Sequence, residues 1–356
     1  MTFSDINELI QQKNPFAGHT VVRPPQIWRK SFPDVVSINA RASNAVLDAV
    51  QKINQGQRQT VGITIRGEKG LGKTQIISRI RHQLQASGDA LFVYIGKHDN
   101  LDKINYQFLQ NVASSLRVFG SVRDVMQWQE LAASLINESR GCNYTPKQYI
   151  NGFPGLLQKH SNRVVDKMTD RVIQNKPEIS DPYLIKAILW TLSPAHATYA
   201  VYWLSGLELT DQQAEIMGLP NRTKEERESD ALTTARQILN IVSNYRIPVI
   251  CFDELDGTDA SEHGWTAAQL SANLAKDLYN NLKSGVFVLS MYEETWRDQV
   301  LGGDKRPETQ TWRQIDQIVV KKDRSAIVNK TYLIKNDESI IPKTPSSSNN
   351  SLGVVK

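Results

Sequence analysis

The stretch GEKGLGKT, Gly67 to Thr74, decides the fold of this chain. It fits in full the pattern G-x-x-x-x-G-K-[ST], which is typical of a loop that binds phosphate groups. The β-branched run Val61–Ile65 precedes it, and residues 74–86 follow with apolar side chains at helical spacing. A strand, a glycine loop and a helix form the context that this motif requires, so a chance glycine turn is the weaker interpretation.

Each part of this loop has a physical role in holding a nucleotide. Glycines let backbone N–H groups close around a β-phosphate, and the following helix directs its positive N-terminal end at the same anion. Lys73 is expected to reach the β- and γ-phosphates, and the Thr74 hydroxyl to coordinate Mg²⁺. The residues predicted to bind the nucleotide are Gly67, Glu68, Lys69, Gly70, Leu71, Gly72, Lys73, Thr74 and Gln75.

A second apolar run, Ile247–Phe252, ends in two acidic residues, Asp253 and Glu254. Open α/β sheets bind ligands at the carboxyl ends of their strands. Asp253 is predicted to hold the Mg²⁺ water shell, because this hard cation prefers oxygen ligands. Glu254 is the predicted catalytic residue that orients and polarises an attacking water. Alone the pattern is a weak signal, but downstream of a complete phosphate loop it favours a hydrolytic site.

A further predicted strand, 285–290, ends in Ser290, which we expect to sense the γ-phosphate or to position water. The alternative is a serine that only terminates the strand. Arg297 and Arg306 follow, and each is a candidate arginine finger that acts on the nucleotide of a neighbouring subunit. The alternative for both is a solvated surface arginine.

The sequence between the second and third predicted strands is unusually long. Roughly 150 residues separate Ile95 from Ile247, far more than a structureless loop should hold. Their apolar spacing is helical and shows no strand-like alternation. The helical candidates are 104–119, 122–138, 149–173, 183–204 and 225–245. The predicted fold is therefore an α/β, P-loop NTPase parallel sheet flanked by helices, with a large all-helical insertion between the second and third core strands.

Cysteine usage and hydropathy restrict the class of protein. Cys142 and Cys251 are the only cysteines, which excludes a disulfide framework and a four-thiolate zinc site and favours a cytoplasmic, reducing compartment. The N-terminal residues 1–13 do not form a secretory signal. The uncharged run Ala187–Leu207 is long enough to span a bilayer, but Pro194 interrupts it, so two short buried helices are preferred and no membrane association is expected.

The net charge of +5 raises the possibility of nucleic-acid binding. From Lys321 onward there are seven Lys or Arg and three Asp or Glu, so this tail carries +4 and the rest of the chain +1. The body is therefore nearly neutral overall. A local basic patch on it remains possible, and DNA stays open as a partner.

Taken together, these segments resemble the AAA+ and STAND ATPases. The nearest likeness is to ATP-binding proteins of bacterial phage-defence (BREX-type) systems and to origin-recognition-like ATPases, over most of residues 20–300. The residues that carry it are GEKGLGKT (67–74), VICFDELD (249–256) and VFVLSMYEETW (286–296), with a weaker echo in WLSGLEL (203–209). The resemblance implies a five-stranded parallel sheet, ATP with Mg²⁺ as cofactors, and a homo-oligomer or multi-protein assembly.

The resemblance also implies a helical lid after the fifth strand, often with an arginine on the nucleotide. This chain departs from that pattern, because its tail has few periodic apolar residues. Arg313 or Arg324 could replace the lid arginine. Either Ile315–Val320 or Thr331–Ile334 is expected to form the fifth strand, and the segment from about 342 is expected to be disordered.

The predicted organisation has five parts. They are an N-terminal segment near the adenine site (1–57), the first part of the ATPase core (58–98), the helical insertion (99–235), the second part of the core (236–300) and an irregular C-terminal segment (301–356). In the first part, Ser37 or Asn39 is expected to cap a helix over 41–55. Ile27, Trp28 and Phe32 are expected either near the adenine or simply in the core.

Three functions are compatible with these patterns. The first is a Mg²⁺-dependent ATPase that acts as a switch in a larger assembly, for which the resemblance indicates anti-phage defence. The second is an ATP-dependent DNA-binding loader or a regulator of transposition or replication. The third is a kinase of small molecules, which the large insertion and the Asp253–Glu254 pair disfavour.

Overall fold

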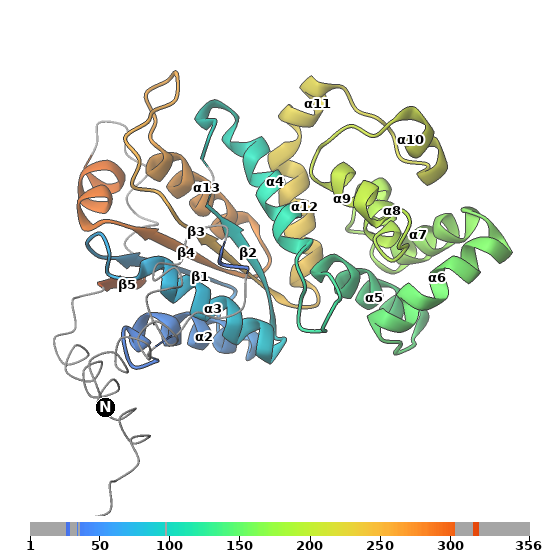
Figure 1. Cartoon of the computed structure of the whole chain (residues 1–356), viewed down its shortest axis with the longest axis horizontal. Helices are drawn as coiled ribbons and strands as arrows, with labels where there is room; N and C mark the ends of the chain where they lie inside the picture. The colour runs from blue at the N-terminus through green and yellow to red at the C-terminus, as the bar shows by residue number, and fades with distance from the viewer. Residues whose placement is uncertain (1–25, 29–33, 35, 97, 303–315, 320–356) are drawn as a thin grey trace, which may run out of the picture.

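A parallel sheet forms the centre of the protein. The computed structural model describes residues 26–28, 34, 36–96, 98–302 and 316–319. Five strands lie in the order β2-β3-β4-β1-β5, and every pair of neighbours is parallel (Figure 1). They are β1 (Thr60–Arg66), β2 (Ala90–Ile95), β3 (Ile247–Phe252), β4 (Gly285–Met291) and β5 (Asp316–Val319). The predicted α/β class is confirmed, and of the two alternatives for the fifth strand the first is present.

Both faces of the sheet are covered by helices, as a parallel sheet requires. Residues of β2 alternate between the two faces: Phe92 and Tyr94 join the hydrophobic cluster under α2 (Ala40–Asn54) and α3 (Lys73–Ser87). Leu91, Val93 and Ile95 join the cluster on the opposite face. The helices that cover this opposite face are α4 (Ile104–Leu116), α12 (Ala231–Ser243) and α13 (Ala267–Asn281).

In the described residues between β2 and β3 the regular elements are helices, as predicted, apart from an isolated antiparallel bridge between Phe119 and Met126. Between α4 and α12 lie α5 (Gln127–Arg140), α6 (Pro146–His160), α7 (Arg163–Asn175), α8 (Pro182–Trp190), α9 (Ala197–Leu204), α10 (Asp211–Met217) and α11 (Lys224–Ser229), and the short 3₁₀ turn η2 (Leu101–Lys103) precedes α4. The predicted helix 149–173 is in fact two helices, since Ser161 adopts a left-handed φ of 54° between them. The predicted helix 183–204 is likewise divided into α8 and α9.

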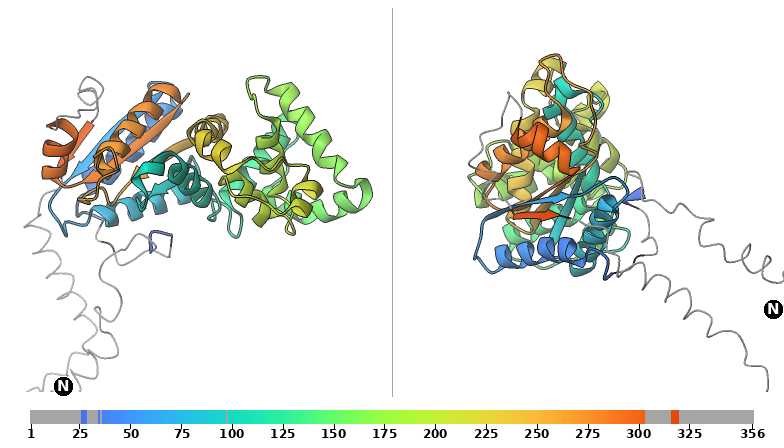
Figure 2. Two further views of the ribbon diagram at one scale, coloured as in Figure 1. Left: turned by 90° about the horizontal axis from the view of Figure 1, so that it is seen from above. Right: turned by 90° about the vertical axis from the view of Figure 1, so that its left-hand side faces the viewer.

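The helical segment is joined to the sheet through a continuous core. Buried residues of α5, α7 and α8 belong to the same hydrophobic cluster as those of α4, α12 and the sheet. In Figure 1 and in the left-hand view of Figure 2, α4 and α12 lie between the sheet and the lobe formed by α5 to α9. The predicted boundary at residue 235 falls inside α12, which runs unbroken. Within the described ranges, no helix has the length and apolar character needed to cross a membrane.

The predicted N-cap of α2 needs correction. Asn39 precedes α2, but its side chain makes no capping bond; instead Nδ2 donates to the Leu71 carbonyl at 3.3 Å. Ser37 does not occupy the capping position. Ile27 is fully buried in the core, and the Trp28 ring packs edge-on against Phe92 at 5.5 Å. Both residues are therefore core contacts, which is the second of the two alternatives predicted for them.

Some predictions fall outside the described residues. They concern Phe32, Arg306, Arg313, Arg324, the alternative strand 331–334 and the disorder expected from about 342.

Side chains of the helical segment close the edge of the sheet at β2. Gln127 accepts from the Phe92 N–H at 2.9 Å and donates back to the Phe92 carbonyl at 3.1 Å. Ser115 does the same two residues on, accepting from Tyr94 N–H at 3.0 Å and donating to its carbonyl at 3.3 Å. An exposed edge strand offers unpaired N–H and C=O groups to other chains. Here two side chains replace the missing neighbour strand.

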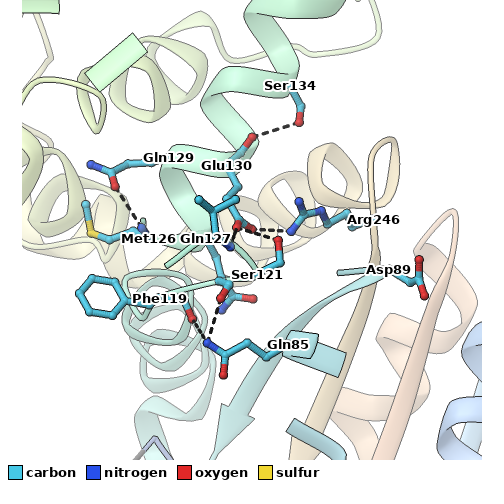
Figure 3. A network of polar contacts seen from close by, with 12 residues as sticks. Gln85, Asp89, Phe119, Ser121, Met126, Gln127, Gln129, Glu130, Ser134 and Arg246 are labelled. Atoms are coloured by element: carbon cyan, nitrogen blue, oxygen red, sulfur yellow. Dashed lines mark hydrogen bonds and ion pairs between the residues drawn. The ribbon is translucent and has the colours of Figure 1, made fainter. Parts of the chain in front are cut away.

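A buried carboxylate ties this region to the start of β3. Glu130 of α5 is 3% exposed and accepts from Ser121 Oγ at 2.9 Å and Val122 N–H at 2.7 Å. It also forms an ion pair with Arg246, which immediately precedes β3 (Figure 3). The chain therefore returns from the helical lobe to the sheet at a position that α5 holds.

We predict that Gln127→Ala destabilises the protein by about 3 kcal/mol, because the buried Phe92 N–H and C=O lose their partner. Chemical denaturation measures the free energy of unfolding. Gln158→Ala, on the exposed face of α6, is the control and should change it by less than about 0.5 kcal/mol. A loss below about 1 kcal/mol for Gln127→Ala would contradict the role assigned to this side chain.

Candidate nucleotide-binding site

The glycine loop connects the carboxyl end of β1 to the start of α3. Gly70 and Gly72 have φ values of 82° and 81°, a left-handed conformation that glycine adopts without strain. A Cβ on Gly70 would meet no atom within 4 Å, so backbone conformation rather than crowding requires glycine there. The Gly67 N–H donates to the Met291 carbonyl at 3.3 Å, which anchors the loop to the end of β4.

Lys73, the first residue of α3, lies under this loop and is 8% exposed. Its Nζ donates to the carbonyls of Gly67 at 2.9 Å and Glu68 at 3.2 Å, and it lies 4.1 Å from the centre of the Tyr292 ring. Since an ammonium has three donors, one remains for an anion. Burial lowers the pKa of Lys73, and the nearby Asp256 carboxylate is the largest influence in the opposite direction.

A hydrogen bond joins the two distant motifs. Thr74 Oγ1 donates to Asp253 Oδ2 at 2.9 Å, although the two residues are 179 positions apart. The bond is possible because β1 and β3 end at the same edge of a parallel sheet, with β4 between them. Asp253 is 3% exposed, and its own N–H donates to the Ile95 carbonyl at 2.9 Å. The structure therefore brings together Lys73, Thr74 and Asp253, as the sequence predicted.

Glu254 has an unusual backbone conformation. Its φ is 57°, and left-handed values are rare for a residue that is neither glycine nor asparagine. Partial burial is the largest cause that raises the pKa of Glu254, and the nearby carboxylates of Asp253 and Asp256 raise it further. Such strained residues cluster at functional sites, where the surrounding structure holds them in place. The side chain is solvent-accessible, which suits a group that must reach water.

Ser290 is fully buried near the end of β4, where it pairs in register with Ile65 of β1. Its hydroxyl has no hydrogen-bond partner among the described residues, which is uncommon for a buried polar atom. The predicted role at the γ-phosphate stays a prediction. Arg297 is exposed and pairs with the adjacent Asp298 at 2.7 Å, and among the described residues no hydrogen bond or ion pair joins it to Asp253, Glu254 or Asp256.

Sequence reasoning missed four residues at this site. Tyr94 donates to Asp253 Oδ2 at 3.2 Å, and His98 Nε2 lies 2.9 Å from the Asp253 carbonyl. Asp256 accepts from the Tyr292 N–H at 2.6 Å, and burial raises the pKa of its carboxyl. Only Asp256 carried a usable signal, because it lies in the same acidic motif as Asp253 and Glu254. The other three become visible only once the strands are aligned.

The donor set suits a hard divalent cation. Thr74 supplies a hydroxyl and Asp253 a carboxylate, and Mg²⁺ is typically held by one or two protein oxygens together with substrate phosphates. In the described part of the chain, no group of three or more His, Cys, Asp or Glu side chains forms a metal cage of its own. This arrangement fits a metal that arrives with a phosphate ligand better than a structural metal.

Comparison with models of protein families, with curated proteins and with solved structures found no match to this chain.

We predict that Glu254→Gly is more stable than Glu254→Ala by about 1 kcal/mol, because only glycine adopts the left-handed conformation without a Cβ clash. Both variants lose the same carboxylate, so the comparison isolates the backbone term. Urea denaturation of the two nucleotide-free proteins gives the difference. Equal stabilities would show that the chain does not hold residue 254 in this conformation.

Proposed function

We propose that this protein is a Mg²⁺-dependent ATPase of the AAA+/STAND type that acts as a nucleotide-controlled switch. The observation that carries the proposal is the Thr74–Asp253 hydrogen bond beside the buried Lys73. It places a hydroxyl, a carboxylate and an ammonium from two distant segments at one end of the sheet. The order β2-β3-β4-β1-β5, with the glycine loop after β1 and the acids after β3, supports the finer assignment to a P-loop NTPase.

Phosphoryl transfer requires mainly positioning and charge neutralisation, and the residues divide these tasks. The glycine loop and the start of α3 present N–H groups to the phosphates, and Lys73 adds one positive charge. Thr74 and Asp253 would hold Mg²⁺, which when bound neutralises charge on the phosphate oxygens. Glu254 orients the attacking water through its carboxylate.

The helical segment is the element that a nucleotide could bias. Its first helix, α4, contacts Tyr94 of the site through the two Ser115–Tyr94 bonds, and its last helix, α12, leads directly into β3. A difference in contacts between the ATP and ADP states would therefore act on both ends of this segment. In this proposal Ser290 responds to the γ-phosphate and Arg297 acts on a neighbouring subunit, within an assembly that serves anti-phage defence.

The proposal predicts distinct effects for two single substitutions. Lys73→Ala should weaken ATP binding at least about tenfold and abolish turnover, because the phosphates lose their ammonium. Glu254→Gln should bind ATP as the wild type does while turnover falls about 10²- to 10³-fold, because only the water-orienting carboxylate is lost. Equilibrium binding and release of inorganic phosphate with Mg²⁺ measure the two effects.

Exposed Gln158→Ala serves as the unaffected control in the same assays. A wild-type protein that binds no ATP at micromolar concentrations would overturn the proposal. A phosphorylated acceptor in place of free phosphate would instead indicate a kinase.

One observation favours DNA as a partner in the second candidate function, an ATP-dependent DNA-binding loader or regulator. Residues 140–176 contain seven Lys or Arg and two Asp or Glu, a local charge of +5 in a chain whose total is also +5. Arg163, Lys167 and Arg171 lie at four-residue intervals on the exposed face of α7, with Asp170 beside them. No ion pair joins these three cations to an acid in the described part of the chain. In Figure 1, α7 lies in the lobe beyond α4 and α12, away from the sheet.

The triple variant Arg163→Gln, Lys167→Gln, Arg171→Gln tests this candidate. If α7 contacts phosphates, the negative slope of log affinity against log salt concentration should become shallower by about 2 to 3 units, because three contacts that release counterions are lost. Fluorescence anisotropy with duplex and single-stranded DNA, with ATP present, measures it. The matched control changes Arg41, Arg58 and Lys224 to Gln. These residues are also exposed, and this variant should retain the wild-type slope. No DNA affinity at low salt would reject the candidate.

A further inference from the structure

Two hydroxyl groups converge on one oxygen of Asp253. Oδ2 accepts from Thr74 Oγ1 at 2.9 Å and from the Tyr94 hydroxyl at 3.2 Å. Among the described residues, neither hydroxyl donates to the other oxygen, Oδ1. Two donors on a single oxygen hold the carboxylate against rotation about its last side-chain bond. Oδ2 is thereby engaged by the protein, whereas no described side chain donates a hydrogen bond to Oδ1.

Three features fix the position of the Tyr94 side chain. The ring is 6% exposed within the core on the α3 face of the sheet. Ser115 bonds both the N–H and the carbonyl of Tyr94, so the strand cannot shift without breaking them. Gly96 allows the ring to fold back over the chain, since a Cβ there would lie 2.5 Å from Cε1 and 2.6 Å from the hydroxyl oxygen.

The Tyr94 hydroxyl donates to the carboxylate in its neutral form. Burial raises the pKa of Tyr94 far above its ordinary value, and the neighbouring Asp253 carboxylate acts in the same direction. A phenol that does not ionise can serve only as a fixed neutral partner to the carboxylate.

We propose that Tyr94 is a positioning residue that orients the Asp253 carboxylate for a divalent cation arriving with a nucleotide, in support of Thr74. The inference rests on the proposed function, because it assigns a role within the same site. Partners that orient a metal-binding carboxylate typically change metal affinity by about 10- to 100-fold when they are removed. Thr74 remains in place in the variants below, so the effect expected here lies at the lower end.

The test is Tyr94→Phe, which removes the hydroxyl and keeps the ring. ADP affinity is measured over a series of Mg²⁺ concentrations, and the concentration at half of the full increase in affinity is compared with the wild type. In Tyr94→Phe this concentration should rise about tenfold. ADP affinity in EDTA should stay within about twofold, because the phosphate loop is unchanged. A general loss of structure would weaken both, so their ratio separates positioning from instability. Electron paramagnetic resonance of Mn²⁺ with ADP gives a readout independent of turnover and should show the same weakening.

Two further variants sharpen the test. Tyr149→Phe also removes a buried hydroxyl bond, to Asn137 at 2.7 Å, but lies in α6, so its Mg²⁺ dependence should match the wild type. Gly96→Ala keeps every polar atom and displaces the Tyr94 ring, so it should reproduce the weakened Mg²⁺ response of Tyr94→Phe. Combining the two changes should weaken it little further, since both act through the same hydroxyl.

The outcomes distinguish this inference from the function on which it rests. If the wild type binds ADP in a metal-dependent way and Tyr94→Phe requires the same Mg²⁺ concentration, the positioning role is wrong while the nucleotide site stands. If the wild type shows no metal-dependent nucleotide binding, both are wrong.

Discussion

The structure depends on one contact, the hydrogen bond between the Thr74 hydroxyl and the Asp253 carboxylate. It joins the first residues of α3 to the residue after β3, so it requires β1, β4 and β3 to be aligned correctly at their carboxyl ends. A one-residue shift in the register of β1 or β3 would turn the side chains that meet there to the opposite face of the sheet. The bond also brings a carboxylate close to the buried Lys73, which carries an opposite charge in a poorly solvated position. Sheet register and site electrostatics are therefore a single constraint.

The helical segment helps to hold the strands of the site in register. Gln127 and Ser115 complete the hydrogen bonds of β2, and the buried Glu130 pairs with Arg246 at the entrance to β3. Both strands that flank the acidic side of the site are thus held by side chains from α4 and α5. A single hydrophobic cluster extends from the sheet into this lobe, so a movement of one would be transmitted through packed side chains to the other.

The carboxylates of Asp253, Glu254 and Asp256 lie together near the ammonium of Lys73. Burial raises the pKa values of Glu254 and Asp256, and the nearby Asp253 carboxylate acts on both in the same direction. The backbone at Glu254 has a left-handed φ. Lys73 is the cation that faces this group. A polyphosphate with a divalent cation would bring its own positive charge to the acids and its negative charge to the lysine and the loop N–H groups. The arrangement is more consistent with a ligand site than with a structural ion-pair network.

The sequence by itself determined the local elements, because glycine spacing, β-branched runs and helical apolar periodicity are properties of neighbouring residues. Lys73, Thr74 and the acids after β3 were predictable for this reason, as was the helical character of the long segment. Only the tertiary structure decided which distant groups meet. Strand order and register determine the contacts of Tyr94, His98 and Tyr292 with the site. They also determine that Asn39 donates to the Leu71 carbonyl instead of capping α2, and that Gln127 bonds the edge of β2. These are long-range properties that local spacing does not encode.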